Sequence, residues 1–190
     1  MQKITGSKFS EWYVTLNELK GSGFKSWSFL PGMLFGDLTM WWGNQGDRAK
    51  PHEGLDLAIF LDAEKREQQL TATMLVPPLF RGRVINIIDD LLGRTIIIEH
   101  PVNNGEGSTL NAFYAHLIPH RSVIKGKEFG PGETLGTIAP GSNNCPAHLH
   151  ISTAWCSRET RLSNFSWNNQ KDPTIKLFDP NVMIGATSTF

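Results

Sequence analysis

The sequence Pro146-Ala147-His148-Leu149-His150-Ile151-Ser152 contains two histidines separated by one residue and flanked by apolar, strand-forming side chains. Successive side chains of a strand point to opposite faces, so a strand here would turn both imidazoles toward one side. Neutral imidazole is the most common nitrogen ligand of metal ions, and a second imidazole can act beside the ion. The stretch therefore predicts a strand with a candidate metal ligand, although such pairs also occur as surface or half-buried residues of ordinary strands.

The rest of the chain also has the pattern of short strands separated by turns. Its 190 residues include 18 glycines, 11 prolines and 11 phenylalanines, a composition typical of β-rich globular proteins. Strong turn signals such as Pro77-Pro78, Asn103-Asn104-Gly105 and Gly130-Pro131-Gly132 divide the apolar runs. We expect an all-β fold, mainly an antiparallel sheet or sandwich, with strands at residues 73–76, 82–88, 95–99, 111–117, 122–124 and 135–138.

Two segments depart from this strand pattern. Trp12, Leu16 and Leu19 recur at near-helical spacing within residues 10–21, which predicts a short N-terminal helix. Residues 63–70 are charged and rich in helix formers, so we expect a solvated, minor helical insertion there.

Charge, hydropathy and cysteine content narrow the classes of function. The 18 basic and 18 acidic residues balance to a net charge of zero, which argues against nucleic-acid binding through a basic face. No apolar run has the length of a membrane span or of a signal peptide, so we expect a periplasmic or extracellular location if an export signal has been trimmed, and a cytoplasmic one otherwise. Cys145 and Cys156 can form a disulfide or remain free, and we favour two free thiols.

A second candidate ligand pair precedes another strand-like run. His52 and Asp56 are separated by three residues, and Gly54 with the apolar residues after it favours a turn that leads into a strand. An imidazole and a carboxylate offer nitrogen and oxygen to one divalent ion, and the carboxylate partly neutralises the ion's charge. A turn that carries histidine and aspartate is nevertheless common without such chemistry.

A further histidine, His116, lies at the end of the predicted strand at residues 111–117. The period of two places Tyr114 on the same face of that strand. A strand-end histidine is more often structural than catalytic, and we expect structural roles for His100 and His120.

In order and setting, these pieces resemble the lysostaphin/LytM family of zinc metallopeptidases. Residues 111–117 are similar to the family's tyrosine-alanine-histidine-leucine strand, and residues 123–136 to the glycine-punctuated segment that follows it. Residues 146–150 are similar to the closing proline-histidine-leucine-histidine signature. The resemblance covers about residues 42–154 and implies a lysostaphin-like fold.

The resemblance implies a division of roles among the candidate residues. His116 and His148 would be the unligated catalytic histidines, with Tyr114 as a possible donor to an oxyanion. Three protein ligands leave a fourth position for a water that zinc activates, and a histidine beside the ion can accept its proton. One zinc ion per chain would be held by two imidazoles and one carboxylate: those of His52, His150 and Asp56.

The resemblance also implies a function, and two alternatives stay open. The implied protein is a monomeric zinc endopeptidase that hydrolyses peptide bonds of bacterial cell-wall peptidoglycan through a metal-activated water. The alternatives are a non-catalytic wall-binding or hydrolase-activating module on the same fold, and a metal-dependent hydrolase of a non-wall substrate. The long spacer after Asp56 and the unusual turn at residues 139–145 depart from the family's pattern and leave the scissile bond undefined.

Three parts of the chain follow from this interpretation. We expect an N-terminal helix and aromatic extension at residues 1–41, a lysostaphin-like metallopeptidase domain at 42–155, and a C-terminal extension packed on it at 156–190. The aromatic side chains of residues 24–46 either pack against the core or form one wall of a binding groove. The C-terminal extension, with Asn164 to Asn169, can cover a sheet edge, line the groove or contact a partner.

Overall fold

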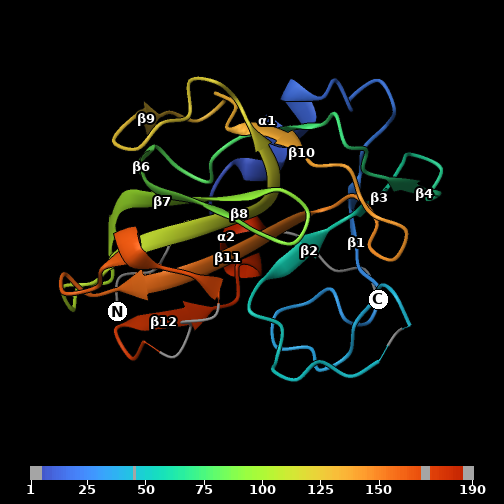
Figure 1. Cartoon of the computed structure of the whole chain (residues 1–190). Coiled ribbons are helices and arrows are strands. Elements are labelled where there is room, and N and C mark those ends of the chain that lie inside the picture. The colour runs from blue at the N-terminus through green and yellow to red at the C-terminus, as the bar shows by residue number, and fades with distance from the viewer. Residues whose placement is uncertain (1–5, 45, 168–171, 186–190) are drawn as a thin grey trace.

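A large antiparallel sheet dominates the fold. The computed structural model describes residues 6–44, 46–167 and 172–185. Within these residues nine strands form one sheet, whose main path runs β12-β11-β8-β7-β6-β9 (Figure 1). Along the chain these strands are β6 (Gly82–Asp89), β7 (Arg94–Asn103), β8 (Thr109–Pro119), β9 (Glu128–Phe129), β11 (Leu149–Cys156) and β12 (Ile175–Phe178).

Short strands and helices complete the described architecture. β2 (Leu55–Leu57) pairs with β11, and β10 (Gly136–Ile138) pairs with both β8 and β5 (Leu75–Val76). A separate sheet contains β1 (Ser26–Ser28), β3 (Ile59–Leu61) and β4 (Glu67–Gln69). The helical segments are α1 (Phe9–Leu16), a 3₁₀ turn (Leu162–Asn164) and α2 (Asn181–Ile184).

Both faces of the large sheet are buried. Side chains alternate along its central strands, so successive residues enter two different cores. On one face, Ile96, Ile98, Ala112 and Tyr114 join a core that includes residues of α1 and Trp27. On the other face, a smaller core contains Ile97, Phe113, Leu162 and Phe165. Residues that follow β11 therefore cover the second face of the sheet.

The structure confirms the all-β, antiparallel fold class and most of the predicted strands. The predictions at residues 82–88, 95–99 and 111–117 lie within β6, β7 and β8. Residues 122–124 form no strand, because two turns close around them: Val123 N–H donates to the His120 carbonyl and Lys127 N–H to the Ile124 carbonyl. The division into three parts stays a prediction, and its boundary at residue 155 falls inside β11.

The predicted N-terminal helix is present but shorter, and a different face is buried. α1 ends at Leu16, and Asn17 donates from its side chain to the carbonyl oxygens of Tyr13 and Leu75. Phe9 and Tyr13 are fully buried, whereas Trp12 is half-buried. Among the described residues, no helix is long and apolar enough to cross a bilayer.

The helical prediction for residues 63–70 is wrong, although residues 63–69 are exposed or half-buried as expected and only Leu70 of the segment is buried. It forms the turn and second strand of the β3–β4 hairpin, in which Ile59 pairs with Gln69. The carboxylate of Asp62 accepts hydrogen bonds from the backbone N–H groups of Glu64 and Arg66 and so closes the turn. Intrinsic helix propensity is weak over so short a segment, and the strand partner overrides it.

Candidate metal centre and active site

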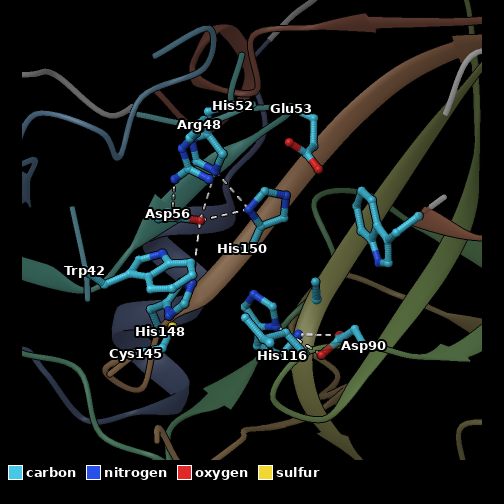
Figure 2. Close-up of a pocket in the computed structure, with 13 residues that line it drawn as sticks. Trp42, Arg48, His52, Glu53, Asp56, Asp90, His116, Cys145, His148 and His150 are labelled. Carbon is cyan, nitrogen blue, oxygen red and sulfur yellow. Dashed lines mark hydrogen bonds and ion pairs between the residues drawn. The ribbon is translucent and has the colours of Figure 1, made fainter. Parts of the chain in front are cut away.

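Strand pairing brings the predicted ligands together from distant parts of the chain. β2 lies antiparallel to β11, with Asp56 directly opposite His150. On its other side β11 pairs with β8, where Ala115 lies opposite His150. Figure 2 shows the resulting cluster of Asp56, His150 and His52 on one side of a cavity.

Gly54 allows β2 to approach β11 this closely. A Cβ atom on Gly54 would lie 2.7 Å from Nε2 of His150 and would also collide with the carbonyl oxygen of Ile151. The sequence predicts a bend at this glycine. The structure shows that the imidazole ring of His150, a candidate ligand, occupies the space where a Cβ atom would lie.

The three candidate ligand atoms converge on one point. Oδ1 of Asp56 lies 2.8 Å from Nδ1 of His150 and 3.3 Å from Nε2 of His52. The two imidazole nitrogens are 3.1 Å apart. All three residues are buried, so solvent screens the interactions among these groups only weakly.

Hydrogen bonds on the far side of each ring set the tautomers. Nδ1 of His52 lies 3.0 Å from the carbonyl oxygen of Leu34, which can only accept, so Nδ1 carries the proton and Nε2 presents a lone pair. Nε2 of His150 lies 2.9 Å from the hydroxyl oxygen of Ser152 and can donate to it, which leaves Nδ1 as the ligand atom. Burial lowers the pKa of His150, so its ring is neutral at neutral pH.

The second oxygen of Asp56 is held from the opposite side. Trp41 Nε1–H donates to Oδ2 at 2.7 Å, and Nη2 of Arg48 lies 3.7 Å from the same oxygen. Arg48 is itself anchored by donation to the carbonyl oxygens of Thr39 and Gly32. Burial alone raises the pKa of Asp56, but interactions with the surrounding histidines outweigh it and hold the pKa well below its usual range.

This donor set fits zinc. A carboxylate oxygen and two nitrogen lone pairs within 3.3 Å of one another repel unless a proton or a cation lies among them. Two imidazoles and one carboxylate are the protein ligands of a common class of catalytic zinc site, which keeps a fourth position open. Each candidate ligand also has an orienting partner, as metal ligands in proteins usually do. The residues that would hold the ion are those predicted from the sequence: His52, Asp56 and His150.

Two further histidines lie beside this cluster. Nδ1–H of His148 donates to the Pro146 carbonyl at 2.8 Å, and its Nε2 lies 3.7 Å from Oδ1 of Asp56. Trp41 packs edge-on against the His148 ring, and the ring of His116 lies 4.7 Å from that of His148, centroid to centroid. Burial lowers the pKa of His148 to about 4, so this ring is neutral at neutral pH.

A β-bulge turns His116 into the cavity. Where the register between β7 and β8 shifts, β7 contributes only Thr95, whereas β8 contributes both Ala115 and His116. His116 has a φ of 63°, in the left-handed region that non-glycine residues rarely adopt. Bulges commonly redirect a side chain next to an active site. Here Ala115 and His116 both line the cavity, although a regular strand would place them on opposite faces.

For the same reason Tyr114 and His116 do not share a face, contrary to the expectation from the sequence. Tyr114 is fully buried, and its hydroxyl accepts a hydrogen bond from the Leu79 N–H at 2.8 Å. The hydroxyl oxygen lies 3.3 Å from Nε2 of His100, whose Nδ1–H donates to the Arg81 carbonyl. Because this chain of hydrogen bonds lies in the core and Tyr114 does not line the cavity, we leave Tyr114 out of the proposed active site.

Several residues of the cavity and its surroundings were not recognised as functional from the sequence. In the sequence Asp90 is recognisable only as a turn residue, and Arg48 and Ser152 belong to no motif that assigns them a role. In the aromatic stretch, Trp27 and Trp41 pack in core clusters, and Trp41 also contacts Asp56 and His148. Trp42 forms part of the cavity wall. Gln45 in the aromatic stretch and Asn168 and Asn169 in the C-terminal extension lie outside the described residues.

The two cysteines are free and buried. Cys145 lines the cavity, and burial raises the pKa of its thiol to about 11. Burial likewise raises the pKa of Cys156 to about 12. Both therefore remain protonated thiols at neutral pH and do not offer a thiolate to a metal or a substrate.

Comparison with known proteins gives structural matches. No family model and no curated protein matches the sequence. The catalytic domain of lysostaphin from Staphylococcus simulans matches with 18% identity over 85% of this chain and 92% of that chain, at a TM-score of 0.47. A Pseudomonas aeruginosa protein ascribed to peptidase M23 matches with 20% identity over 94% of this chain and 62% of its own, at a TM-score of 0.45.

The solution structure of lysostaphin also matches, with 17% identity over 63% of this chain and a TM-score of 0.41. The chain spans 40% of the length of that protein. Identities and TM-scores are low throughout, so a function has to be inferred from the geometry of the site itself. The chain resembles the lysostaphin-type M23 peptidases in its sequence motifs, and lysostaphin is among the solved structures that it matches.

Proposed function

We propose that this protein is a zinc-dependent endopeptidase that hydrolyses peptide bonds of bacterial cell-wall peptidoglycan. One observation carries the proposal: three ligand atoms of His52, Asp56 and His150 converge beside two histidines that are not part of the ligand set. The sequence motifs around these residues, which resemble those of lysostaphin-type enzymes, support the peptidoglycan substrate.

The ligand cluster has the charge and shape that hydrolysis requires. One carboxylate and two neutral imidazoles leave a divalent cation with a net positive charge. Zinc in such a site supplies a Lewis acid that polarises a peptide carbonyl and makes a water acidic enough to lose its proton near neutral pH. Arg48, close to the outer oxygen of Asp56, adds further positive potential to this wall of the cavity.

His148 and His116 can move protons on the open side of the cluster. Nδ1 of His148 donates to a backbone carbonyl, so its Nε2 carries a lone pair, and this atom lies 3.7 Å from the ligand oxygen of Asp56. It is placed to accept a proton from water beside the ligands. His116 faces the same cavity, with its ring 4.7 Å from that of His148, and once its Nε2 has accepted a proton from the reacting groups it can pass that proton to the leaving amine.

The cavity walls suit an extended peptide. Trp42, Leu91 and Trp167 border the opening around the histidines, and Leu91 is 67% exposed. Apolar and aromatic walls of this kind bury the apolar surface of a bound ligand, while polar groups of the site fix its orientation.

Alanine variants of four of the five site residues test the proposal against purified peptidoglycan. We expect Asp56→Ala and His150→Ala to lose both bound zinc and hydrolysis, and His116→Ala and His148→Ala to lose hydrolysis while keeping zinc. General acid–base catalysis accelerates a reaction roughly 10²–10⁴-fold, so we expect the hydrolysis rates of His116→Ala and His148→Ala to fall by about that factor. His120→Ala, which removes an exposed histidine away from the cavity, is the matched control.

Three results would contradict the proposal. If His148→Ala emptied the site while His150→Ala kept zinc, the assigned roles would be wrong. Stoichiometric zinc without hydrolysis of any wall preparation would favour the non-catalytic module, and cleavage of soluble peptides without cleavage of wall would point to another substrate.

A further inference from the structure

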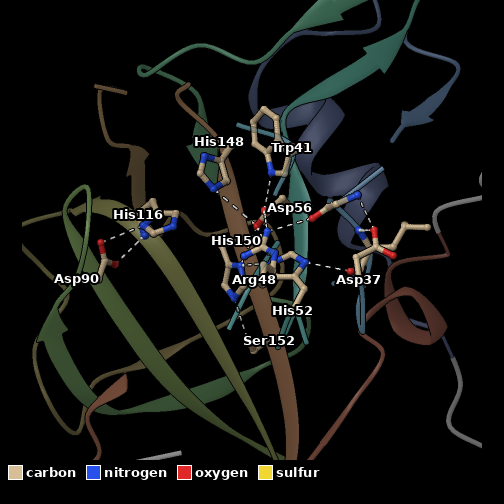
Figure 3. A network of polar contacts seen from close by, with 12 residues as sticks. Asp37, Trp41, Arg48, His52, Asp56, Asp90, His116, His148, His150 and Ser152 are labelled. Carbon is tan, nitrogen blue, oxygen red and sulfur yellow. Dashed lines mark hydrogen bonds and ion pairs between the residues drawn. The ribbon is translucent and has the colours of Figure 1, made fainter. Parts of the chain in front are cut away.

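Asp90 occupies an unusual position for a residue of a hairpin turn. It follows β6 directly, and its side chain is only 2% exposed although the next residue, Leu91, is 67% exposed. Backbone N–H groups of Leu92 and Gly93 donate to its Oδ1 and close the turn. Figure 3 shows its carboxylate directed from the turn toward His116.

The carboxylate of Asp90 accepts two hydrogen bonds from His116. Its Oδ1 lies 3.0 Å from Nδ1 of His116, and its Oδ2 accepts the backbone N–H of the same residue at 2.9 Å. The second bond holds the backbone at the bulge, where φ is 63°. One side chain therefore fixes both the strained backbone and the orientation of the ring.

The charge of Asp90 sets the tautomer of His116. Burial alone raises the pKa of Asp90, but the hydrogen bonds from the ring and backbone of His116 outweigh it and hold the pKa below its usual range. An ionised carboxylate only accepts hydrogen bonds, so Nδ1 of His116 carries the ring proton. In the neutral ring Nε2 then has a free lone pair, while the ring as a whole lines the cavity.

A second layer of hydrogen bonds holds the carboxylate in turn. Thr95 Oγ1–H donates to Oδ2 of Asp90 at 2.8 Å, and Trp167 Nε1–H donates to Oγ1 of Thr95 at 3.0 Å. Trp167 also lines the cavity and packs edge-on against His150, with centroids 5.8 Å apart. A continuous path of donors thus runs from the C-terminal part of the chain to the ring of His116.

The geometry points to Asp90 as a positioning residue that holds His116 in its Nδ1–H tautomer, so that Nε2 exchanges protons with the reacting groups. This inference rests on the proposed function for its catalytic meaning, but the tautomer itself is a property of the folded protein. Asp90 acts through His116 and does not reach the substrate. A correct tautomer matters because general acid–base transfer requires the proton at the right nitrogen.

Asp90→Ala tests the inference, with Asp89→Ala as the matched control. Asp89 is the neighbouring carboxylate, which is 83% exposed and forms an ion pair with the exposed Arg94. Nitrogen-15 NMR of the histidine rings should show a single Nδ1–H tautomer for His116 in the parent protein and in Asp89→Ala. In Asp90→Ala we expect the Nε2–H form to appear, with zinc content unchanged.

Kinetics on a soluble peptidoglycan digest give the second readout. We expect kcat of Asp90→Ala to fall roughly 10²-fold while KM changes less than about threefold, because ring orientation affects proton transfer rather than binding. An unchanged tautomer in folded Asp90→Ala, or equal losses in Asp89→Ala, would overturn the inference. If no digest is cleaved by the parent protein, the proposed function fails, whereas the NMR result still decides the tautomer.

Asp90→Asn covers the case in which Asp90→Ala does not fold. The amide oxygen keeps an acceptor for the turn and for the ring N–H, but the negative charge is lost. We expect an intermediate fall in kcat that exceeds that of Asp89→Asn. A kcat equal to that of the parent protein would overturn the role of the charge.

Discussion

Replacing His116 by alanine and by glycine isolates the backbone strain of the bulge. A φ of 63° costs a residue with a Cβ atom about 1–2 kcal/mol relative to glycine. Both variants lose the ring and its hydrogen bond to Asp90, so these losses cancel when the two are compared. The difference in their free energies of unfolding then reports on the backbone alone.

The expected magnitude follows from two opposing terms. Glycine avoids the left-handed penalty of about 1–2 kcal/mol, but its unfolded chain is more flexible, which costs roughly 0.5–1 kcal/mol relative to alanine. His116→Gly should therefore be more stable than His116→Ala by about 0.7 kcal/mol. At the adjacent Ala115, which does not have a positive φ and is 1% exposed, Ala115→Gly should instead destabilise the protein.

Urea denaturation of the metal-free proteins measures these differences, provided that the m-values agree. The account predicts opposite signs for glycine relative to alanine at the two adjacent positions. If glycine were also the less stable residue at position 116, the left-handed conformation and the bulge that redirects His116 would both be refuted.

Three more predictions concern the surroundings of the site. Tyr114→Phe should lower the free energy of unfolding by about 1–3 kcal/mol, because the buried Leu79 N–H loses its acceptor, while activity per folded molecule stays unchanged; lost activity at full stability would instead place the hydroxyl in the reaction. Burial lowers the pKa of His100 from 6.5 to about 4, so the unfolded chain binds more protons between these values and stability falls as the pH falls through that window. The loss should total roughly 3 kcal/mol in urea titrations of the metal-free protein, and a variant His100→Gln with the same pH slope would contradict it. Trp41→Phe removes the donor to Oδ2 of Asp56 and should weaken zinc affinity roughly 10–100-fold in a chelator competition assay, whereas unchanged affinity would show that this bond does not orient the ligand.

The sequence is sufficient to predict which residues converge in the candidate metal site, because their motifs are local. In His148-Leu149-His150 and in the segment from His52 to Asp56, the chemistry is concentrated within a few residues of a strand. Apolar runs bounded by turn signals likewise identify β6, β7 and β8, and β7 and β8 are buried along most of their length because a core covers each face of the sheet.

The face of His116 could not be predicted, because a bulge is not visible in an alternating pattern. One extra residue in β8 reverses the faces of all residues beyond it, so the same rule that places strand residues correctly elsewhere fails for Tyr114 and His116. The helix expected at residues 63–70 fails for a related reason, since cross-strand partners far along the chain decide the conformation of a short segment.

The supporting residues could not be predicted either, since their roles depend on contacts between distant segments. Trp41 lies in a loop that precedes β2 and donates a hydrogen bond to Asp56. Arg48 lies near the same carboxylate because the carbonyl groups of Gly32 and Thr39 hold its guanidinium in place. The sequence identifies Asp90 as a turn residue, and it does close a turn. Its hydrogen bond with the ring of His116 forms only when the sheet brings the two residues together.

Metal content tests the central claim most directly. The measurement is mass spectrometry of protein purified without added metal, run in parallel on the parent chain and on Asp56→Ala. The account predicts about one zinc per chain in the parent protein and none in Asp56→Ala, as expected for a three-ligand site that loses its only carboxylate. A parent protein that retains no zinc even after zinc is offered back would contradict it, and the convergence of His52, Asp56 and His150 would then need another explanation.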